Sequence, residues 1–158
     1  MSVTLAPMND ADFVTFAERA VAEYGDGMVA AGEWGREQAS QKARSVFEQL
    51  LPQGRLTEKN QLWVIKDQAR RVGELWIAER NAGVGKIAFI LDIYIDPGER
   101  RQGYAKQSLL ALESWARQAG CEEVRLHVFG RNNAARRLYE QLGYGIASLT
   151  MAKPLPPA

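Results

Sequence analysis

A short basic loop carries the residue types that bind phosphate. It reads Arg100, Arg101, Gln102, Gly103, Tyr104, Ala105 and Lys106, and it lies between an apolar run and a helical pattern. In a strand–loop–helix arrangement, backbone N–H groups converge at the helix N-terminus, and the helix dipole adds positive charge there. Gly103 would let the backbone approach phosphates closely, and the small Ala105 would let the first helical turn approach the ligand. The loop predicts a pyrophosphate site, but a basic turn before an ordinary helix fits the local pattern equally well.

A second glycine-rich segment, Gly83-Val84-Gly85-Lys86, does not match the phosphate loop of nucleotide-binding enzymes. Ile87 stands where that motif needs Ser or Thr, and no glycine lies six residues before Lys86. The Gly-x-Gly-x-x-Gly spacing of a dinucleotide fold is also absent after the strand. We interpret this segment as a hairpin turn.

The charge distribution agrees with an anionic ligand at the loop. Glu99 to Arg137 contains eight Lys or Arg and four Asp or Glu, whereas the whole chain has a net charge of only +1. A local basic excess attracts an anion to this region. The near-neutral total argues against nucleic-acid binding, which requires a substantial basic surface.

The apolar periodicity predicts the elements that position the loop. Strands are expected at Val3–Ala6, Leu62–Ile65, Val72–Ala78, Ile87–Ile95, Val124–Phe129 and Ala147–Ala152, of which the second to fourth form an antiparallel meander. Helices are expected from Asn9 or Asp10 to Tyr24, from Ala39 to Leu50, over Tyr104–Ala119, and from Asn132 or Asn133 to Gly143. Because a helix separates Ile87–Ile95 from Val124–Phe129, these two strands should run parallel.

Length and composition point to a single cytoplasmic domain over residues 1–158. A chain of 158 residues can bury one shared core. Its longest uninterrupted apolar stretch, Ile87–Leu91, is far below the roughly 20 residues that span a bilayer, and no signal peptide is recognisable, so we predict no membrane association. With one cysteine, Cys121, and one histidine, His127, neither a disulfide nor a metal site is expected.

Two segments extend the pattern beyond the loop. The first is Ile93-Tyr94-Ile95-Asp96-Pro97 followed by Arg100-x-x-Gly103-x-Ala105. The second is Asn132-x-x-Ala135-x-x-Leu138-Tyr139-Glu140-x-x-Gly143-Tyr144. In this order and at this distance, they resemble motifs A and B of the GNAT superfamily of acetyl-CoA-dependent N-acetyltransferases.

The resemblance implies a fold and a cosubstrate. The fold is a mixed α/β single domain whose central, mostly antiparallel sheet has about seven strands, is flanked by helices, and is splayed between the fourth and fifth strands. Acetyl-CoA would bind in that opening. Its contacts would be the backbone at Ile93, Tyr94 and Ile95, the loop residues Arg100, Arg101, Gln102, Gly103, Tyr104, Ala105 and Lys106, and the motif B residues Asn132, Ala135 and Tyr139.

The resemblance also suggests an acid and a base for direct transfer of the acetyl group to an amine. Tyr139 matches the tyrosine that protonates the departing thiolate, although it could instead be a core aromatic residue. For the base, Asp92 lies one residue after the position where relatives often carry Glu, so side-chain alternation would turn it to the other face unless a bulge intervenes. His127 lies at another position where relatives carry a catalytic Glu, and we favour it. A water chain is a further alternative.

Several alternatives stay open at this point. A non-catalytic acyl-CoA-binding or sensor domain would keep motif A but need neither Tyr139 nor a base. An interaction module that binds phosphates through the basic loop is less consistent with the low net charge. The acceptor amine is not specified by the sequence, and a homodimer is possible.

Overall fold

Five strands form one sheet in the computed structural model, which describes residues 2–158. They are β1 (Val3–Pro7), β2 (Asn60–Asp67), β3 (Arg70–Ala82), β4 (Gly85–Ile95) and β5 (Glu123–Leu126), and they lie side by side in chain order. Neighbours from β1 to β4 are antiparallel, whereas β4 and β5 run parallel. The mixed α/β class, the antiparallel meander and the parallel pair are therefore confirmed.

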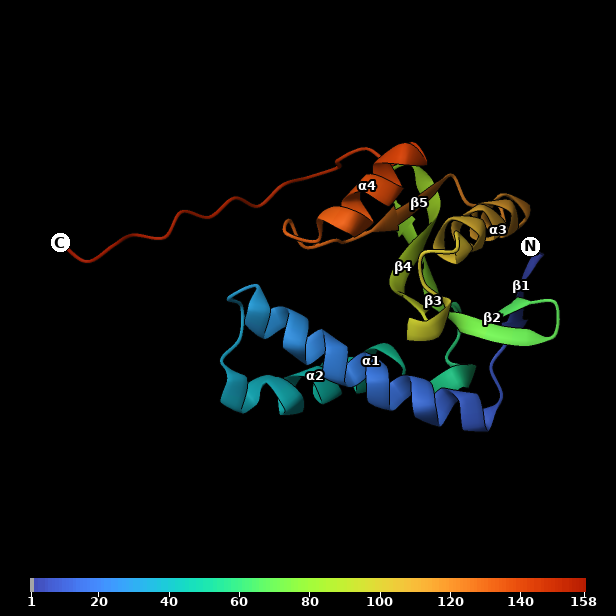
Figure 1. Cartoon of the computed structure of the whole chain (residues 1–158), viewed down its shortest axis with the longest axis horizontal. Coiled ribbons are helices and arrows are strands. Elements are labelled where there is room, and N and C mark those ends of the chain that lie inside the picture. The colour runs from blue at the N-terminus through green and yellow to red at the C-terminus, as the bar shows by residue number, and fades with distance from the viewer. Residues whose placement is uncertain (1) are drawn as a thin grey trace. The chain divides into compact units, whose positions relative to one another are not determined.

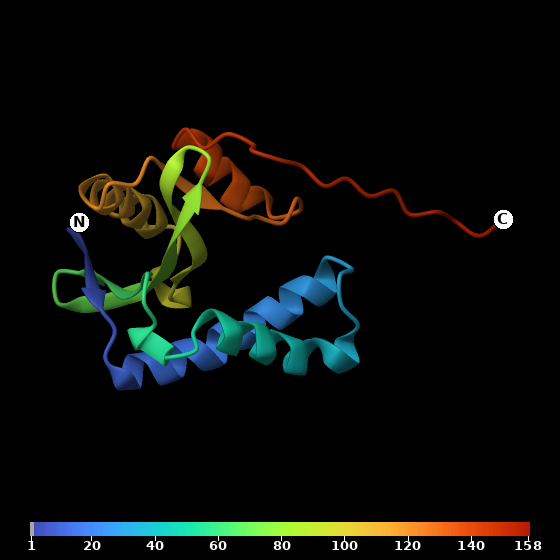
Figure 2. The same cartoon turned by 180° about the vertical axis from the view of Figure 1, so that it is seen from behind.

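Four α-helices and two short 3₁₀ turns complete the secondary structure of the described residues. The helices are α1 (Asp10–Ala30), α2 (Arg36–Leu50), α3 (Tyr104–Gln118) and α4 (Asn133–Gln141), and the turns are Gly54–Leu56 and Pro97–Glu99. The chain divides into a first unit that ends at His127 and a second unit that begins at Val128 and contains α4. Figures 1 and 2 show the elements from opposite sides.

Three strand predictions are wrong. About seven strands were expected, and residues 2–158 contain five. The predicted strand Ala147–Ala152 has no strand structure, and its Leu149 and Met151 side chains are 69% and 88% exposed. The predicted strand Val124–Phe129 ends early, at Leu126. The errors at Ala147–Ala152 and after Leu126 have one reason: a strand requires a backbone partner, and an alternating sequence does not supply one.

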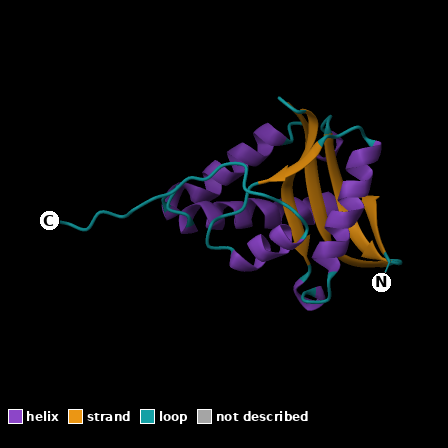
Figure 3. Ribbon diagram, turned by 90° about the horizontal axis from the view of Figure 1, so that it is seen from above, coloured by secondary structure: helices purple, strands orange, loops and turns teal. Residues whose placement is uncertain are grey.

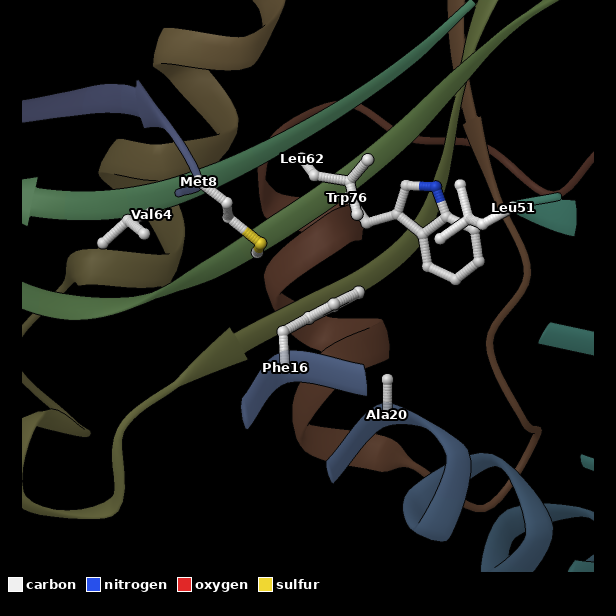
Figure 4. Packing of buried hydrophobic residues seen from close by; sticks show 7 residues of the cluster. All are labelled: Met8, Phe16, Ala20, Leu51, Leu62, Val64 and Trp76. Carbon is white, nitrogen blue, oxygen red and sulfur yellow. The ribbon is translucent and has the colours of Figure 1, made fainter. Parts of the chain in front are cut away.

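In the first unit, helices cover both faces of the sheet (Figure 3). The face under α1 and α2 holds a buried cluster of Met8, Phe16, Ala20, Leu51, Leu62, Val64 and Trp76, drawn in Figure 4. The opposite face packs against α3, where the Trp63 and Trp115 rings meet with centroids 5.1 Å apart. Successive residues of β2 thus point to different helices, which explains its continuous apolar sequence.

The long helix α1 begins and continues as its sequence dictates. The Asn9 side chain accepts a hydrogen bond from the Asp12 N–H at 2.8 Å, and the Asp12 carboxylate accepts one from the Asn9 N–H at 3.0 Å. These reciprocal bonds form a capping box. The helix was expected to end at Tyr24, but α1 runs through Gly25 to Ala30. A Cβ at Gly25 would lie 3.3 Å from the Ala39 carbonyl oxygen, so the glycine permits close packing of α2 on α1.

Candidate active site

The loop between β4 and α3 has the backbone form of an anion site. Arg101 and Gly103 both adopt left-handed conformations, with φ of 62° and 89°. Gly103 is the N-cap of α3, and in the described structure this helix start has neither a side-chain cap nor an acidic residue in its first turn. The first N–H groups of α3 therefore keep their partial positive charge and would stabilise an anionic group placed against them.

The side chains of this loop divide into two groups. Gln102 and Lys106 are exposed, as a ligand contact requires. The Arg100 side chain instead returns to the end of β4, where its Nε donates to the Ile95 carbonyl at 2.9 Å and its guanidinium carbon lies 5.2 Å from the centre of the Tyr94 ring. Arg100 therefore joins the loop to the strand before it.

The side chain of Tyr104 connects the loop to the turn between β2 and β3. Its side chain is buried, and its hydroxyl donates to Asp67 at 2.6 Å and accepts from Arg70 at 3.2 Å. Arg70 also pairs with Glu99 at the start of the loop. The hydrogen bond to the Asp67 carboxylate raises the pKa of Tyr104 and lowers the pKa of Asp67. The β2–β3 turn is thus connected to both ends of the predicted phosphate-binding loop.

Strand β4 extends beyond its pairing with β5. The two strands pair from Ile87 with Glu123 to Ile90 with Leu126, and β5 ends there. Residues 91–95 of β4 have no strand partner on this edge within the described residues. The free edge leads directly into the loop before α3.

The backbone groups at this free edge belong to Ile93 and Ile95. On the opposite edge, the Asp96 N–H donates to the Val72 carbonyl of β3 at 2.9 Å. Because backbone groups of an antiparallel strand alternate between its two edges, Tyr94 also turns its N–H and C=O toward β3. Ile93 and Ile95 then turn theirs away. The Ile95 carbonyl accepts from Arg100 there, and an extended ligand could pair with the remaining groups like an additional strand.

A β-bulge decides the direction of Asp92. The register between β3 and β4 shifts after the Trp76–Asp92 pair, which leaves Leu91 as an extra residue. Leu91 packs against the cluster under α1, and the adjacent Asp92 bonds to Arg19 of α1. Consecutive side chains thus share one face, as a bulge allows. The bulge brings Asp92 to the face that Leu91 occupies.

Arg19 connects α1 to three carboxylates. Its Nη2 donates to Asp92 at 2.7 Å, its Nε to Glu74 at 3.1 Å, and its Nη1 to Glu23 at 2.8 Å. Its guanidinium carbon lies 3.9 Å from the centre of the Tyr94 ring, a cation–π contact. Burial raises the pKa of Asp92, although the hydrogen bond and the charge of Arg19 act in the opposite direction.

A second arginine extends this network toward the loop. Arg71 bonds to both oxygens of Asp96, at 3.1 and 3.2 Å, and its Nη2 lies 3.3 Å from Glu74 Oε1. Glu74 is 1% exposed and receives both arginines on that one oxygen. A continuous chain of ion pairs therefore runs from Asp92 to the residue that follows β4.

The remaining predicted residues lie at or beyond the end of β5. His127 is exposed and follows the last residue of β5, so the prediction that it lies within a strand is wrong. In the second unit, Asn132 caps α4 by accepting from the Ala135 N–H at 3.3 Å. Tyr139 is half-buried, and its ring centre lies 5.7 Å from that of Tyr144. The three motif B residues are thus grouped on α4 and its N-cap.

Comparison with known protein families identifies this arrangement. The model of the acetyltransferase (GNAT) family matches residues 21–144, which include the free edge of β4, the basic loop and α4. The chain belongs to the GNAT acetyltransferase family.

Similar proteins agree with this assignment. The uncharacterized N-acetyltransferase YycN of Bacillus subtilis is 37% identical over 156 residues, covering 98% of this GNAT chain and 100% of YycN. YdgE, an uncharacterized N-acetyltransferase of the same organism, is 31% identical over 98% of this chain and 99% of its own length. The crystal structure of YycN has a TM-score of 0.92, covering 99% of this chain and 100% of that one.

A more distant structure shares the fold. The acetyltransferase AAC(6')-Iy, solved with the bisubstrate analogue CoA-S-monomethyl-acetylneamine, is 14% identical, with a TM-score of 0.62 over 99% of this chain and 100% of that one. The GNAT family uses acetyl-CoA as its cosubstrate. This chain is therefore an acetyl-CoA-dependent acyltransferase.

Sequence reasoning did not find Arg19, Glu74 or Arg71 of the GNAT chain's ion-pair network. Arg19 and Glu74 each interrupt an apolar pattern, Arg19 in the helix with Phe16 and Ala20 and Glu74 in the strand with Leu75. A buried charge needs a partner of opposite sign, so two such interruptions in the sequence are a usable signal of an ion pair.

Among residues 2–158, no helix is long and apolar enough to cross a membrane, and no group of three or more His, Cys, Asp or Glu could hold a metal ion.

Proposed function

We propose that this enzyme transfers the acetyl group of acetyl-CoA to a primary amine by direct attack in a ternary complex. The observation that carries the proposal is the continuity between the free edge of β4 at Ile93 and Ile95 and the uncapped start of α3 at Gly103. The edge offers backbone partners for an extended chain of amides, and the helix start offers N–H groups for phosphates. Pantetheine joined to a pyrophosphate has these two parts in the same order.

Further residues can be assigned to the proposed cosubstrate site. Gln102 and Lys106 are exposed and would interact with phosphate, whereas Tyr104 would act through its backbone because its side chain is buried. From the resemblance to motif B, we also assign Asn132, Ala135 and Tyr139 to contacts with the pantetheine arm. The family match spans the boundary between the units, which supports one catalytic domain over residues 1–158.

The reaction needs a donor for the oxyanion, a base and an acid. The amine nitrogen attacks the acetyl carbonyl carbon, and the Ile93 or Ile95 N–H can donate to the developing oxyanion. As the tetrahedral intermediate collapses, the C–S bond breaks and its electrons go to sulfur. We assign Tyr139 as the acid that protonates this thiolate, so the products are an amide and free CoA thiol.

We assign the base to Asp92 rather than His127. The bulge places Asp92 on the α1 face, and burial raises its pKa, which makes the carboxylate a better proton acceptor near neutral pH. Arg19 engages Oδ2, and within the described residues Oδ1 carries no hydrogen bond. His127 remains the alternative base, and one experiment separates the two.

Thiol release from acetyl-CoA, measured across a library of primary amines, tests the activity. Binding of acetyl-CoA without release of thiol in the presence of any amine would indicate the non-catalytic alternative. With an acceptor of low pKa, kcat should rise with pH through the ionisation of the base, and this rise is the lower limb of the pH profile. Asp92→Asn should remove the lower limb, and His127→Gln should leave it in place. The reverse pattern would assign the base to His127.

A further inference from the structure

Arg19 has a single orientation fixed by its surroundings. Its side chain is 15% exposed, and each of its three guanidinium nitrogens bonds to a different carboxylate. The ring of Tyr94 lies under the guanidinium plane at 3.9 Å. A planar guanidinium held by three bonds and an aromatic ring cannot rotate without losing several contacts. The Arg19 guanidinium is therefore a rigid connection between α1 and β4.

This orientation determines the state of Asp92. The 2.7 Å bond from Arg19 Nη2 holds Oδ2 and thereby fixes the plane of the carboxylate, so Oδ1 is the oxygen left to accept a proton. Without Arg19, Asp92 would share its surroundings with the carboxylates of Glu23 and Glu74, and Glu23 already raises the pKa of Asp92. Like charges in a buried setting favour the protonated acid, which cannot serve as a base.

The other charged groups near Asp92 do not replace Arg19. From β3, Arg71 is committed to Asp96 and to Glu74 Oε1. Along the chain, the neighbouring ionisable residues are Tyr94 on β4 and Asp96 directly after it, and neither is a cation. From β5, His127 follows the last residue of the strand and is exposed. Arg19 is thus the one cation that bonds to Asp92 among the described residues.

We propose that Arg19 is a positioning residue for acetyl transfer, which keeps the Asp92 carboxylate ionised and directs its free oxygen toward the proton of the acceptor amine. This inference rests on the proposed function. As the N–C bond forms, the amine proton passes to Asp92 Oδ1, and the electrons of the breaking C–S bond go to sulfur. Arg19 takes no part in the bond changes. Its contribution lies in the charge and geometry of the base.

The test measures how kcat of the Arg19→Gln variant depends on pH. The assay uses saturating acetyl-CoA and an acceptor amine of low pKa. An adjacent opposite charge lowers the pKa of an aspartate by about 1–3 units, so the lower limb should move up by about 1–3 pH units. The kcat below the displaced limb should fall by about 10-fold or more. The thermal shift caused by acetyl-CoA should stay as in wild type, because Arg19 does not contact the loop before α3.

Two further variants keep the test decisive even if Arg19→Gln folds poorly. Arg19→Lys retains the charge but cannot bond three carboxylates in a planar fork, so its limb should stay near the wild-type position while kcat falls. Arg36→Gln is the matched control, because Arg36 pairs with Asp26 at 2.6 Å on the exposed side of α1 and α2. It should leave both the limb and kcat unchanged.

The outcomes separate this inference from the proposed function. Wild-type protein that releases no thiol with any amine would overturn the proposed function, and this inference with it. A wild-type enzyme with turnover, together with an unmoved limb in Arg19→Gln, would overturn only the role of Arg19. An Arg19→Lys enzyme with a displaced limb or with wild-type kcat would also contradict it.

Discussion

A negative charge at Gly103 should abolish acetyl-CoA binding. Gly103 has φ of 89° and caps α3, whose first N–H groups have no side-chain cap in the described structure. Gly103→Glu introduces a Cβ in a left-handed conformation, which costs about 1–2 kcal/mol of folding free energy. It also places a carboxylate where the pyrophosphate would bind. The first effect destabilises the protein, and the second acts on the ligand.

The charge repulsion can be compared with the free energy that bound acetyl-CoA contributes to stability. A ligand at 100 times its Kd stabilises the folded state by about 2.7 kcal/mol, which for a chain of this size corresponds to a rise in Tm of about 5–11 °C. Two like charges about 4 Å apart near a protein surface repel by about 4 kcal/mol. The repulsion exceeds the binding contribution, so acetyl-CoA should produce almost no thermal shift in Gly103→Glu. Differential scanning fluorimetry with and without acetyl-CoA measures this.

Gly120→Glu is a control with matched backbone strain. Gly120 follows α3 with φ of 81°, and a Cβ there would meet no atom within 4 Å. Both variants should lower the Tm of the free protein by a similar amount, about 2–8 °C. Gly120→Glu should nevertheless keep the full acetyl-CoA shift. If the shift also survives in Gly103→Glu, the helix start does not bind the pyrophosphate.

Three further predictions concern separate parts of the molecule. Tyr139→Phe should lower kcat about 100-fold while the acetyl-CoA thermal shift is retained, and stopped-flow thiol release at wild-type speed would exclude Tyr139 as the acid. Phe16→Ala, at a fully buried ring in the α1 cluster, should lower the free energy of unfolding by about 3–5 kcal/mol in urea titration, and a loss below 1 kcal/mol would contradict the packing. The hydrogen bond from Tyr104 lowers the pKa of Asp67, so this carboxylate stabilises the fold above its unfolded pKa of about 3.9, and that stabilisation is lost as pH falls through the lower folded pKa. Asp67→Asn should therefore weaken the dependence of Tm on pH in the acid range, and an unchanged dependence would show that Asp67 does not contribute.

Features with a local cause were predictable from the sequence. Asn9 caps α1, and the glycines at 103 and 120 border α3, because capping side chains and left-handed glycines act within a few residues of their own position. The strand count was not predictable in this way. Alternation suggested a strand at Ala147–Ala152, but its partner would have to come from elsewhere in the chain, and the structure provides none among the described residues.

In the candidate site, too, the local features were predictable from the sequence and the long-range contacts were not. The basic loop before α3 has a local signature and was found, whereas the ion pairs of Arg19 join residues 55 and 73 positions apart. No short motif encodes such a contact. It depends on the packing of α1 against β3 and β4, and its only trace in the sequence is a charge within an apolar pattern.

The bulge at Leu91 affects both roles proposed for β4, which are to carry Asp92 and to pair with the cosubstrate. One extra residue changes both side-chain direction and backbone direction. Without the extra residue, Asp92 would lie on the α3 face, away from Arg19. The alternation of backbone groups would change as well, so Ile93 and Ile95 would turn their N–H and C=O groups toward β3 and leave Tyr94 at the free edge. The proposed base and the proposed cosubstrate edge are therefore set by the same irregularity. A substitution elsewhere that removed the bulge should impair proton transfer and acetyl-CoA binding together, whereas Asp92→Asn should impair the first alone.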